Sequence, residues 1–184
     1  MGKPLLLIIN GLPASGKTSL ARRLSTDLKL PAFARDSIYE TLYDALAYPQ
    51  NEIPAQLGSA AFALLYHVLG SVLGVGQSVI VEGFFGRPEL RTTEFLKLQQ
   101  VHNFEPFQIM CVADGNVLIK RVIERAKSDA RHFGHQDEAW LAQNKELLLQ
   151  GRIPPLKLSG ELIEIDTTNP EQMDYAGLLH RIRA

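Results

Sequence analysis

The sequence predicts an α/β protein in which helices cover both faces of a sheet of about five parallel strands, a three-layer sandwich. Short apolar runs alternate with amphipathic segments along the whole chain. The runs are apolar at successive positions, which is typical of strands buried on both faces. A helix between every two runs also favours parallel pairing, because a parallel connection needs a crossover.

Each predicted strand is a run of four to seven residues, mostly apolar. The first ends at a glycine, and the third is rich in β-branched residues and lies between Gly76 and Gly83. The strands are predicted over residues 5–10, 31–35, 78–81, 107–113 and 162–166. Ligands of parallel sheets bind at the carboxyl ends of the strands. Those ends carry Asn10-Gly11, Arg35-Asp36, Glu82-Gly83, Ala113-Asp114 and Asp166-Thr167.

The predicted helices show apolar residues at helical spacing, as at Leu20, Leu24 and Leu28. They are predicted over residues 17–28, 37–47, 55–75, 88–101, 116–127, 138–150 and 170–183, with Pro49 closing the second. Within the helix predicted over 55–75, the apolar stretch Leu57–Val75 approaches membrane-spanning length, but His67 and three glycines interrupt it. We therefore expect a buried core helix, and a break near Gly70 is left open.

Composition limits the classes of protein. The 184 residues fit one domain, and 46% hydrophobic with 21% charged residues excludes disorder, collagen and coiled coil. The formal charge of −1 gives no general attraction to nucleic acid or anionic lipid. The single cysteine, Cys111, is expected in the core and suits a reducing compartment. No targeting segment is recognised, so we expect a cytoplasmic protein without membrane attachment.

One phosphate-binding motif stands between the first strand and the first helix. Residues Gly11-Leu12-Pro13-Ala14-Ser15-Gly16-Lys17-Thr18 match the P-loop pattern G-x-x-x-x-G-K-[ST] in full, and Ser19 extends the expected ATP-binding set. The loop's N–H groups and the helix N-terminus attract phosphates. We expect Lys17 to be an exposed loop cation that reaches the β- and γ-phosphates, and Thr18 to ligate Mg²⁺.

The other motifs narrow what happens to the phosphate. A GTPase needs D-x-x-G and then N-K-x-D after the P-loop, but Asn144-Lys145 lacks the aspartate and Asp174–Gly177 comes later still. A mechanical ATPase normally has a longer chain. The sequence therefore favours a small phosphotransferase.

With these motifs the sequence resembles the small P-loop kinases, in particular the AAA-type group that holds polynucleotide 5′-hydroxyl kinase, chloramphenicol phosphotransferase and zeta-toxin-like kinases. The resemblance implies the strand order 2-3-1-4-5 and the use of ATP with Mg²⁺. It also implies that Asp36 is the catalytic base and that Glu82 ends a Walker-B-like strand. Arg121, Arg125 and Arg131 lie where that group has its arginine-rich lid.

Asp36 has two readings. It follows a strand, where a helix N-cap is common, but Ser37 and Glu40 form the capping box S-x-x-E one residue later. We therefore expect Asp36 to be free to bind the acceptor and take its proton. Its neighbour Arg35 either holds an acidic substrate or pairs with a surface carboxylate.

The segment after the third strand contains further candidates. Glu82 either holds a Mg²⁺-bound water, contacts the acceptor or is a solvated strand end. Phe84 is either core or a stacking surface for the acceptor. Residues 82–87 are similar to the D-G-F-P-R segment of adenylate kinases, although the departures weaken a substrate-binding role for Arg87.

Five basic residues between 120 and 131 favour a lid over a solvated helix face, because arginine pairs well with phosphate oxygens. The expected lid is residues 125–137, with a moving loop at 128–137. His132 and His135 on this loop are expected to be exposed or to contact substrate. Thr167 begins the loop that lies beside adenine in the group resembled.

The function expected is therefore phosphoryl transfer from ATP to a hydroxyl of a small molecule, by one domain spanning residues 1–184. Polynucleotide 5′-hydroxyl phosphorylation is an alternative, against which the charge argues. The other alternative is a nucleotide-binding ATPase module without a small acceptor. The sequence does not indicate the acceptor, the preference between ATP and GTP, or the oligomeric state.

Overall fold

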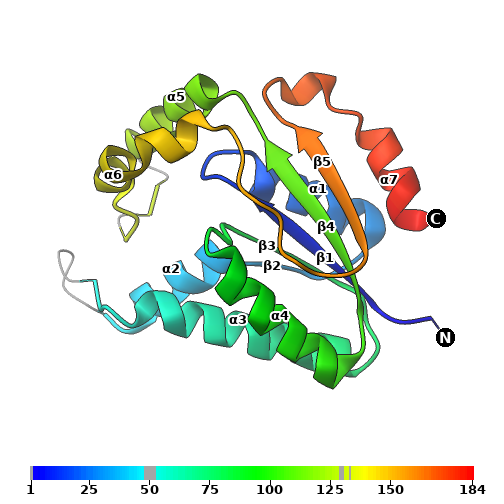
Figure 1. The fold of residues 1–184 in the computed structure, drawn as a ribbon. Helices are drawn as coiled ribbons and strands as arrows, with labels where there is room; N and C mark the ends of the chain where they lie inside the picture. Colours follow the sequence, from blue (N-terminus) through cyan, green and yellow to red (C-terminus); the bar gives the residue numbers. More distant parts are fainter. Residues whose placement is uncertain (1, 48–52, 129–130, 133) are drawn as a thin grey trace.

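A five-stranded parallel sheet forms the centre of the computed structural model, which describes residues 2–47, 53–128, 131–132 and 134–184. The strand order is β2-β3-β1-β4-β5, so the expected order is confirmed (Figure 1). The strands are β1 (Leu5–Gly11), β2 (Ala32–Ala34), β3 (Val79–Gly83), β4 (Glu105–Val112) and β5 (Glu161–Asp166).

Helices connect successive strands, as parallel pairing requires. They are α1 (Lys17–Leu28), α2 (Arg35–Ala45), α3 (Leu57–Gly74), α4 (Pro88–His102), α5 (Gly115–Ala126), α6 (Asp137–Leu149) and α7 (Tyr175–Arg183), with a 3₁₀ turn at Pro170–Gln172. The single helix expected over 170–183 is thus a short turn followed by α7. The other bounds differ from expectation by at most two residues, and Pro49, expected to close the second helix, lies outside the described residues.

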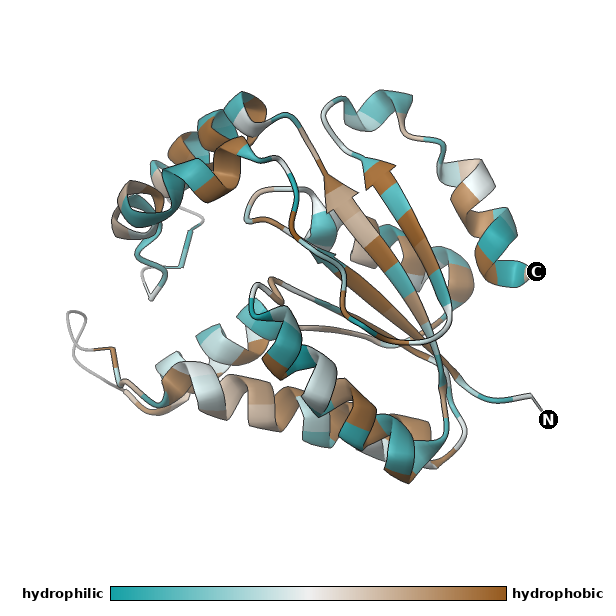
Figure 2. Cartoon of the chain, viewed as in Figure 1, coloured by the Kyte–Doolittle hydropathy of each residue, from teal (hydrophilic) through white to brown (hydrophobic). Residues whose placement is uncertain are grey.

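The two faces of the sheet bury alternate residues of the same strands. On β1, Leu7 and Ile9 pack with α1 and α7, whereas Leu6 and Ile8 pack with α3 and α4. Figure 2 shows the matching pattern, with apolar colour concentrated on the strands and on the inner sides of the helices. The three-layer α/β architecture is therefore confirmed.

The apolar helix α3 belongs to the core. It is long and apolar enough to cross a membrane by composition alone, yet Leu65, Leu69 and Leu73 are buried in the cluster against the sheet. The helix is continuous through Gly70, so the possible break is not found. A Cβ at Gly70 would lie 2.8 Å from Nε2 of His102, so glycine here allows α4 to approach closely.

The site lies beyond the carboxyl ends of the strands. The P-loop leaves β1, α2 begins directly after β2, and the α5–α6 pair stands beyond the end of β4 (Figure 1). A separate core cluster joins these parts, because Leu12 of the P-loop packs with Leu118 of α5 and Leu148 of α6. The phosphate-binding loop and the helix pair are thereby held together by apolar contacts.

Candidate active site

The P-loop has the backbone that phosphate binding requires. Gly11 passes so close to β4 that a Cβ would lie 2.4 Å from the carbonyl oxygen of Cys111. Gly16, at the N-cap of α1, has φ 80°, which glycine adopts without strain. The hydroxyl oxygen of Ser15 is buried and has no hydrogen-bond partner among the described residues. This geometry places the N-terminus of α1 and its N–H groups around a space suited to an anion.

Lys17 is not the exposed cation that was expected. Lys17 is 8% exposed, and its ammonium group donates a hydrogen bond to the carbonyl oxygen of Leu12 at 2.8 Å. Burial lowers the pKa of Lys17, and among the charged neighbours that act on it are Asp36 and Arg125. Leu12, whose carbonyl oxygen accepts this hydrogen bond, belongs to the core cluster that packs the loop against α5 and α6.

Thr18 and Glu82 form an oxygen-rich pair beside the loop. The hydroxyl group of Thr18 donates to Oε1 of Glu82 at 2.8 Å. Burial raises the pKa of Glu82, against the opposing effect of the Lys17 charge. A hydroxyl and a carboxylate are oxygen donors of the type that Mg²⁺ prefers, so the residues fit the ion.

Asp36 lies in the first turn of α2, not in front of the helix. The helix begins at Arg35 with Ala34 at the N-cap, so the expected capping box of Ser37 and Glu40 is wrong. The Glu40 carboxylate instead binds His135 at 2.7 Å. Arg35 donates to Oδ1 of Asp36 at 3.1 Å. Of the two roles expected for Arg35, the structure thus has the pairing with a carboxylate, and the partner is the next residue in the chain.

The carboxyl group of Asp36 is held in its ionised form. Its side chain is 49% exposed, and partial burial alone would raise its pKa. The charges of His135 and Arg35 outweigh this effect and hold the pKa of Asp36 below its ordinary value. The carboxylate is therefore able to accept a hydrogen bond or a proton.

The described part of the α5–α6 loop, residues 127–128, 131–132 and 134–136, contacts α2. Residues 129, 130 and 133, which fall within the expected lid and moving loop, are outside the described residues. Nε2 of His132 lies 3.0 Å from Asp44, and the Tyr39 hydroxyl donates to the carbonyl oxygen of Gly134 at 3.2 Å. The side chains of His132 and His135 are 17% and 10% exposed, so the alternative that they are exposed is wrong, and contact with substrate stays a prediction.

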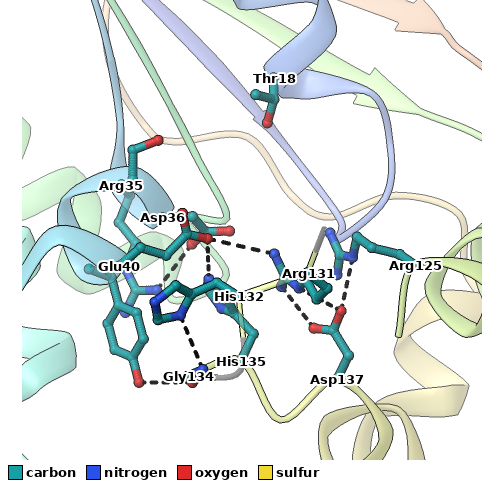
Figure 3. Close-up of polar contacts among 12 residues, drawn as sticks. Thr18, Arg35, Asp36, Glu40, Arg125, Arg131, His132, Gly134, His135 and Asp137 are labelled. Atoms are coloured by element: carbon teal, nitrogen blue, oxygen red, sulfur yellow. Dashed lines mark hydrogen bonds and ion pairs between the residues drawn. The ribbon is translucent and has the colours of Figure 1, made fainter. Parts of the chain in front are cut away.

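The two arginines of the expected lid meet at one carboxylate. Arg125 donates from Nε to Asp137 at 2.9 Å, and Arg131 donates to both oxygens of Asp137 at 2.9 Å (Figure 3). Figure 3 also shows that these side chains and those of α2 come together from opposite sides. Asp137 was not singled out in the sequence, because an acidic residue in the first turn of a helix is common.

A pocket of about 370 Å³ adjoins the P-loop on its outer side. Its walls are Ala14, Gly16, Ser19, Leu20, Arg23, Arg121, Thr167, Pro170 and Met173. Arg121 donates to the carbonyl oxygens of Thr167 and Thr168, which fixes its guanidinium group. The structure thus brings together the expected ATP-binding residues Ser19, Arg121 and Thr167, and adds Arg23, which sequence reasoning missed.

A second pocket, of about 330 Å³, lies on the face of α2 opposite to the one that contacts the α5–α6 loop. Thr18 and Glu82 are among its residues, together with apolar side chains such as Phe33, Ile38 and Leu64. Asp36 is not among them, so this pocket and the Asp36 side of α2 approach the Thr18–Glu82 pair from different directions.

The remaining candidates stand at the edge of this arrangement. Phe84 is half-buried and meets Trp140 of α6 edge-on, with ring centroids 5.9 Å apart. Arg87 is exposed at the N-cap of α4 and is not joined to the cluster by an ion pair with another described residue. Cys111 is buried as expected, and burial raises the pKa of its thiol to about 12.

Comparisons with known proteins agree with this arrangement. The chain matches the AAA domain family over residues 6–148. It is 40% identical to a candidate kinase from Chloroflexus aurantiacus J-10-fl, covering 99% of this chain and 98% of that one with a TM-score of 0.90. No curated protein matches the chain.

Two more distant structures share the fold. A sugar kinase from Janibacter sp. HTCC2649 is 16% identical, with a TM-score of 0.59 and 98% and 92% of the two chains covered. The APS kinase CysC of Mycobacterium tuberculosis, in complex with AMPPNP and APS, is 14% identical, with a TM-score of 0.59 and 100% of both chains covered. With the P-loop, the strand order and the match to residues 6–148, the chain belongs to the AAA domain family and, within it, to the small P-loop kinase group.

Proposed function

We propose that this protein is an ATP-dependent kinase that transfers the γ-phosphoryl group to a hydroxyl of a small molecule. One observation carries the proposal. Thr18 at the end of the P-loop, Asp36 of α2 and Arg125 of α5 come together from three different segments (Figure 3), and the charges of Asp36 and Arg125 are among those that act on the pKa of Lys17. The loop that would bind the phosphate donor, a carboxylate and an arginine thus lie together, as phosphoryl transfer needs.

ATP binding falls to the P-loop and the pocket beside it. The loop N–H groups and Lys17 would hold the β- and γ-phosphates. The pocket lined by Arg121 and Thr167 would hold the base, and its volume of about 370 Å³ suits a nucleotide base. The CysC structure supports the assignment, since that kinase is described in complex with AMPPNP.

Thr18 and Glu82 would hold Mg²⁺, directly or through its bound waters. When bound, the ion neutralises charge that develops on the phosphate oxygens. The contribution of this chain is the orientation of the two oxygen donors, which the hydrogen bond of 2.8 Å between them fixes. Glu82 is 5% exposed, so few waters compete for its carboxylate.

Asp36 would orient the acceptor hydroxyl and take its proton. The lowered pKa of Asp36 keeps the carboxylate ionised at neutral pH. Arg125 and Arg131 would supply positive charge to the transferring phosphoryl group, with water excluded by the docked α5–α6 loop. In this proposal residues 1–184 are one kinase domain, with residues 125–137 as its lid.

The acceptor in this proposal is a small molecule and not a nucleic-acid end. The chain has 19 basic and 20 acidic residues and a net charge of −1, so it lacks a broad basic track. Two neighbours that share the fold are described as kinases of a sugar and of APS, both small molecules.

The proposal is tested by following the γ-phosphoryl group. The protein is incubated with Mg²⁺ and γ-labelled ATP, once with a fractionated metabolite extract and once with a 5′-hydroxyl oligonucleotide. We expect label in a low-molecular-weight ester and none on the oligonucleotide. Label on the oligonucleotide would support the polynucleotide reading, and release of inorganic phosphate alone would support an ATPase module.

A further inference from the structure

Asp137, the first residue of α6, joins two arginines that come from different segments. Arg125 lies in the last turn of α5, and Arg131 lies in the α5–α6 loop. Three hydrogen bonds of 2.9 Å connect them to the one carboxylate, two from Arg131 and one from Arg125. The Asp137 side chain is 10% exposed, so water competes weakly for these contacts.

The two arginines are paired unequally with carboxylates. Arg131 pairs with Asp137 and, at 3.9 Å, also with Glu40, which is hydrogen-bonded to His135 as well. Arg125 forms its ion pair with Asp137, and no second ion pair joins it to another described residue. A carboxylate that is shared with a second arginine neutralises Arg125 only in part, which favours the binding of an anion beside it.

The terminal N–H groups of Arg125 point in a fixed direction and are available to an anion. Arg125 uses Nε for Asp137, while its two terminal nitrogens make no hydrogen bond to another described residue. A guanidinium group has a rigid fork, so fixing Nε also fixes the direction of the terminal N–H groups. Leu12 of the P-loop packs in one cluster with Leu118 and Val122 of α5, the helix that carries Arg125, so this fork lies near the phosphate-binding loop.

We propose that Asp137 is a positioning residue, which fixes the guanidinium groups of Arg125 and Arg131 for the transferring phosphoryl group before the nucleotide binds. This inference rests on the proposed kinase function. Donors that are oriented in advance need no reorganisation when charge develops, so they stabilise the transition state more than mobile donors do. Asp137 itself does not touch the phosphoryl group, because both its oxygens face arginines.

The competing explanation is that Asp137 only joins α5 to α6. The two explanations differ in what aluminium fluoride does, because aluminium fluoride added to Mg·ADP mimics the phosphoryl group in transfer and needs no acceptor to be identified. The measurement is the affinity for Mg·ADP by calorimetry, with and without aluminium fluoride. The ratio of these two affinities isolates the groups that contact the transferring phosphoryl group.

The variant is Asp137→Asn, which keeps the shape and removes the charge, and the matched control is Glu138→Gln. Glu138 is the next residue, exposed in the same first turn, so the control removes the same effect of a charge at a helix N-terminus. We expect Asp137→Asn to lose on the order of tenfold in the aluminium fluoride ratio, the size of one charge-assisted contact. The affinity for Mg·ADP alone, and both values for Glu138→Gln, should match the unmodified protein.

An unchanged ratio in Asp137→Asn, with only a lower melting temperature, would overturn the inference. If Asp137→Asn does not fold, Asp137→Glu is measured in its place, because it keeps the negative charge and moves the carboxylate by one methylene group. A lower ratio with an unchanged affinity for Mg·ADP alone would support the inference, and an unchanged ratio would contradict it. If aluminium fluoride raises the affinity for Mg·ADP but no metabolite is labelled, the proposed kinase function is contradicted, and the positioning role of Asp137 is still tested by the ratio.

Discussion

Lys17 shows how a single side chain serves both the fold and the proposed chemistry. Lys17 is buried, where a positive charge is costly. Its ammonium group donates a hydrogen bond to the carbonyl oxygen of Leu12. Phosphate oxygens are stronger acceptors for a cation than a neutral carbonyl oxygen. The loop therefore holds Lys17 in an arrangement that phosphate binding would improve.

Lys17→Ala should abolish phosphoryl transfer and leave the fold intact, because the change removes a buried charge and not a packed apolar group. We expect a loss of ~10²-fold or more in kcat/KM, as for other preorganised charge contacts. Lys120→Ala, on the exposed side of α5 with a 76% exposed side chain, is the control. Turnover close to that of the unmodified protein in a folded Lys17→Ala variant would contradict the kinase function.

Asp36→Asn should lower kcat by roughly 10²-fold and change the KM for ATP little, because the group acts on the acceptor. A loss of activity that is accompanied by a matching loss of thermal stability would instead indicate that Asp36 serves to stabilise the start of α2. The variant is compared with Glu89→Gln, which changes an exposed carboxylate in the first turn of another helix, α4.

The pH dependence follows from the sign of the shift. In the folded protein the pKa of Asp36 is below its ordinary value. The ionised carboxylate therefore contributes its full stabilisation of the fold at any pH above the ordinary pKa, and this stabilisation is lost only as the pH falls through the lowered pKa. Its base function should therefore persist from pH 8 down to about 5. An activity midpoint near neutrality that disappears in Asp36→Asn would contradict this assignment.

At the level of elements, α2 connects the two halves of the site. One side of this helix carries Asp36 and Glu40 towards the α5–α6 loop, and its other side lines the second pocket with Ser37 and Thr41. The loop is held to α2 by two histidine–carboxylate contacts, at Glu40 and Asp44. The lid in the proposed function thus rests directly on the helix that carries the proposed base.

Removing these two contacts should open the loop. In the double variant Glu40→Gln with Asp44→Asn we expect amide hydrogen exchange of residues 131–135 to accelerate on the order of tenfold. Exchange in β1 should not change. Glu124→Gln, which breaks an exposed pair with Lys120, is the control. Protection that stays unchanged in the double variant would show that other contacts, such as that of Tyr39 with Gly134, hold the loop.

Local patterns predicted most elements but not the contacts between them. The strands were visible because both of their faces are apolar, and the strand order came from the family resemblance, since apolar runs alone do not specify their neighbours. The capping box at Ser37 was wrong because α2 already begins at Arg35, and Glu40 binds His135, a partner 95 residues away that no local pattern reveals. The role of Asp137 was missed for the same reason, because its partners meet it only after α5 and α6 pack together.

On the scale of the whole molecule, the charge is almost balanced and the arginines nearest the site are already paired with this chain's own carboxylates. Arg35 pairs with Asp36, and Arg125 and Arg131 share Asp137. These pairs leave few cations to follow a polynucleotide backbone. The distribution of charge therefore supports a compact acceptor.

We expect weak binding of single-stranded oligonucleotides at physiological salt and no efficient labelling of their 5′ ends. A protein that engaged several phosphates would show a salt slope of roughly −0.7 per contact in a logarithmic plot of affinity. Fluorescence anisotropy over a salt series measures this slope. Micromolar or tighter affinity with a steep slope, together with 5′ phosphorylation, would reverse the choice of acceptor.

The most direct test of the proposed reaction is a crystal structure with Mg·ADP, aluminium fluoride and the acceptor found in the metabolite extract. We predict that the acceptor hydroxyl lies about 2.6–3.2 Å from the Asp36 carboxylate, in line with the aluminium atom and the leaving oxygen of ADP. An acceptor bound on the other face of α2, in the pocket beside Thr18 and Glu82 and away from Asp36, would contradict the proposed mechanism.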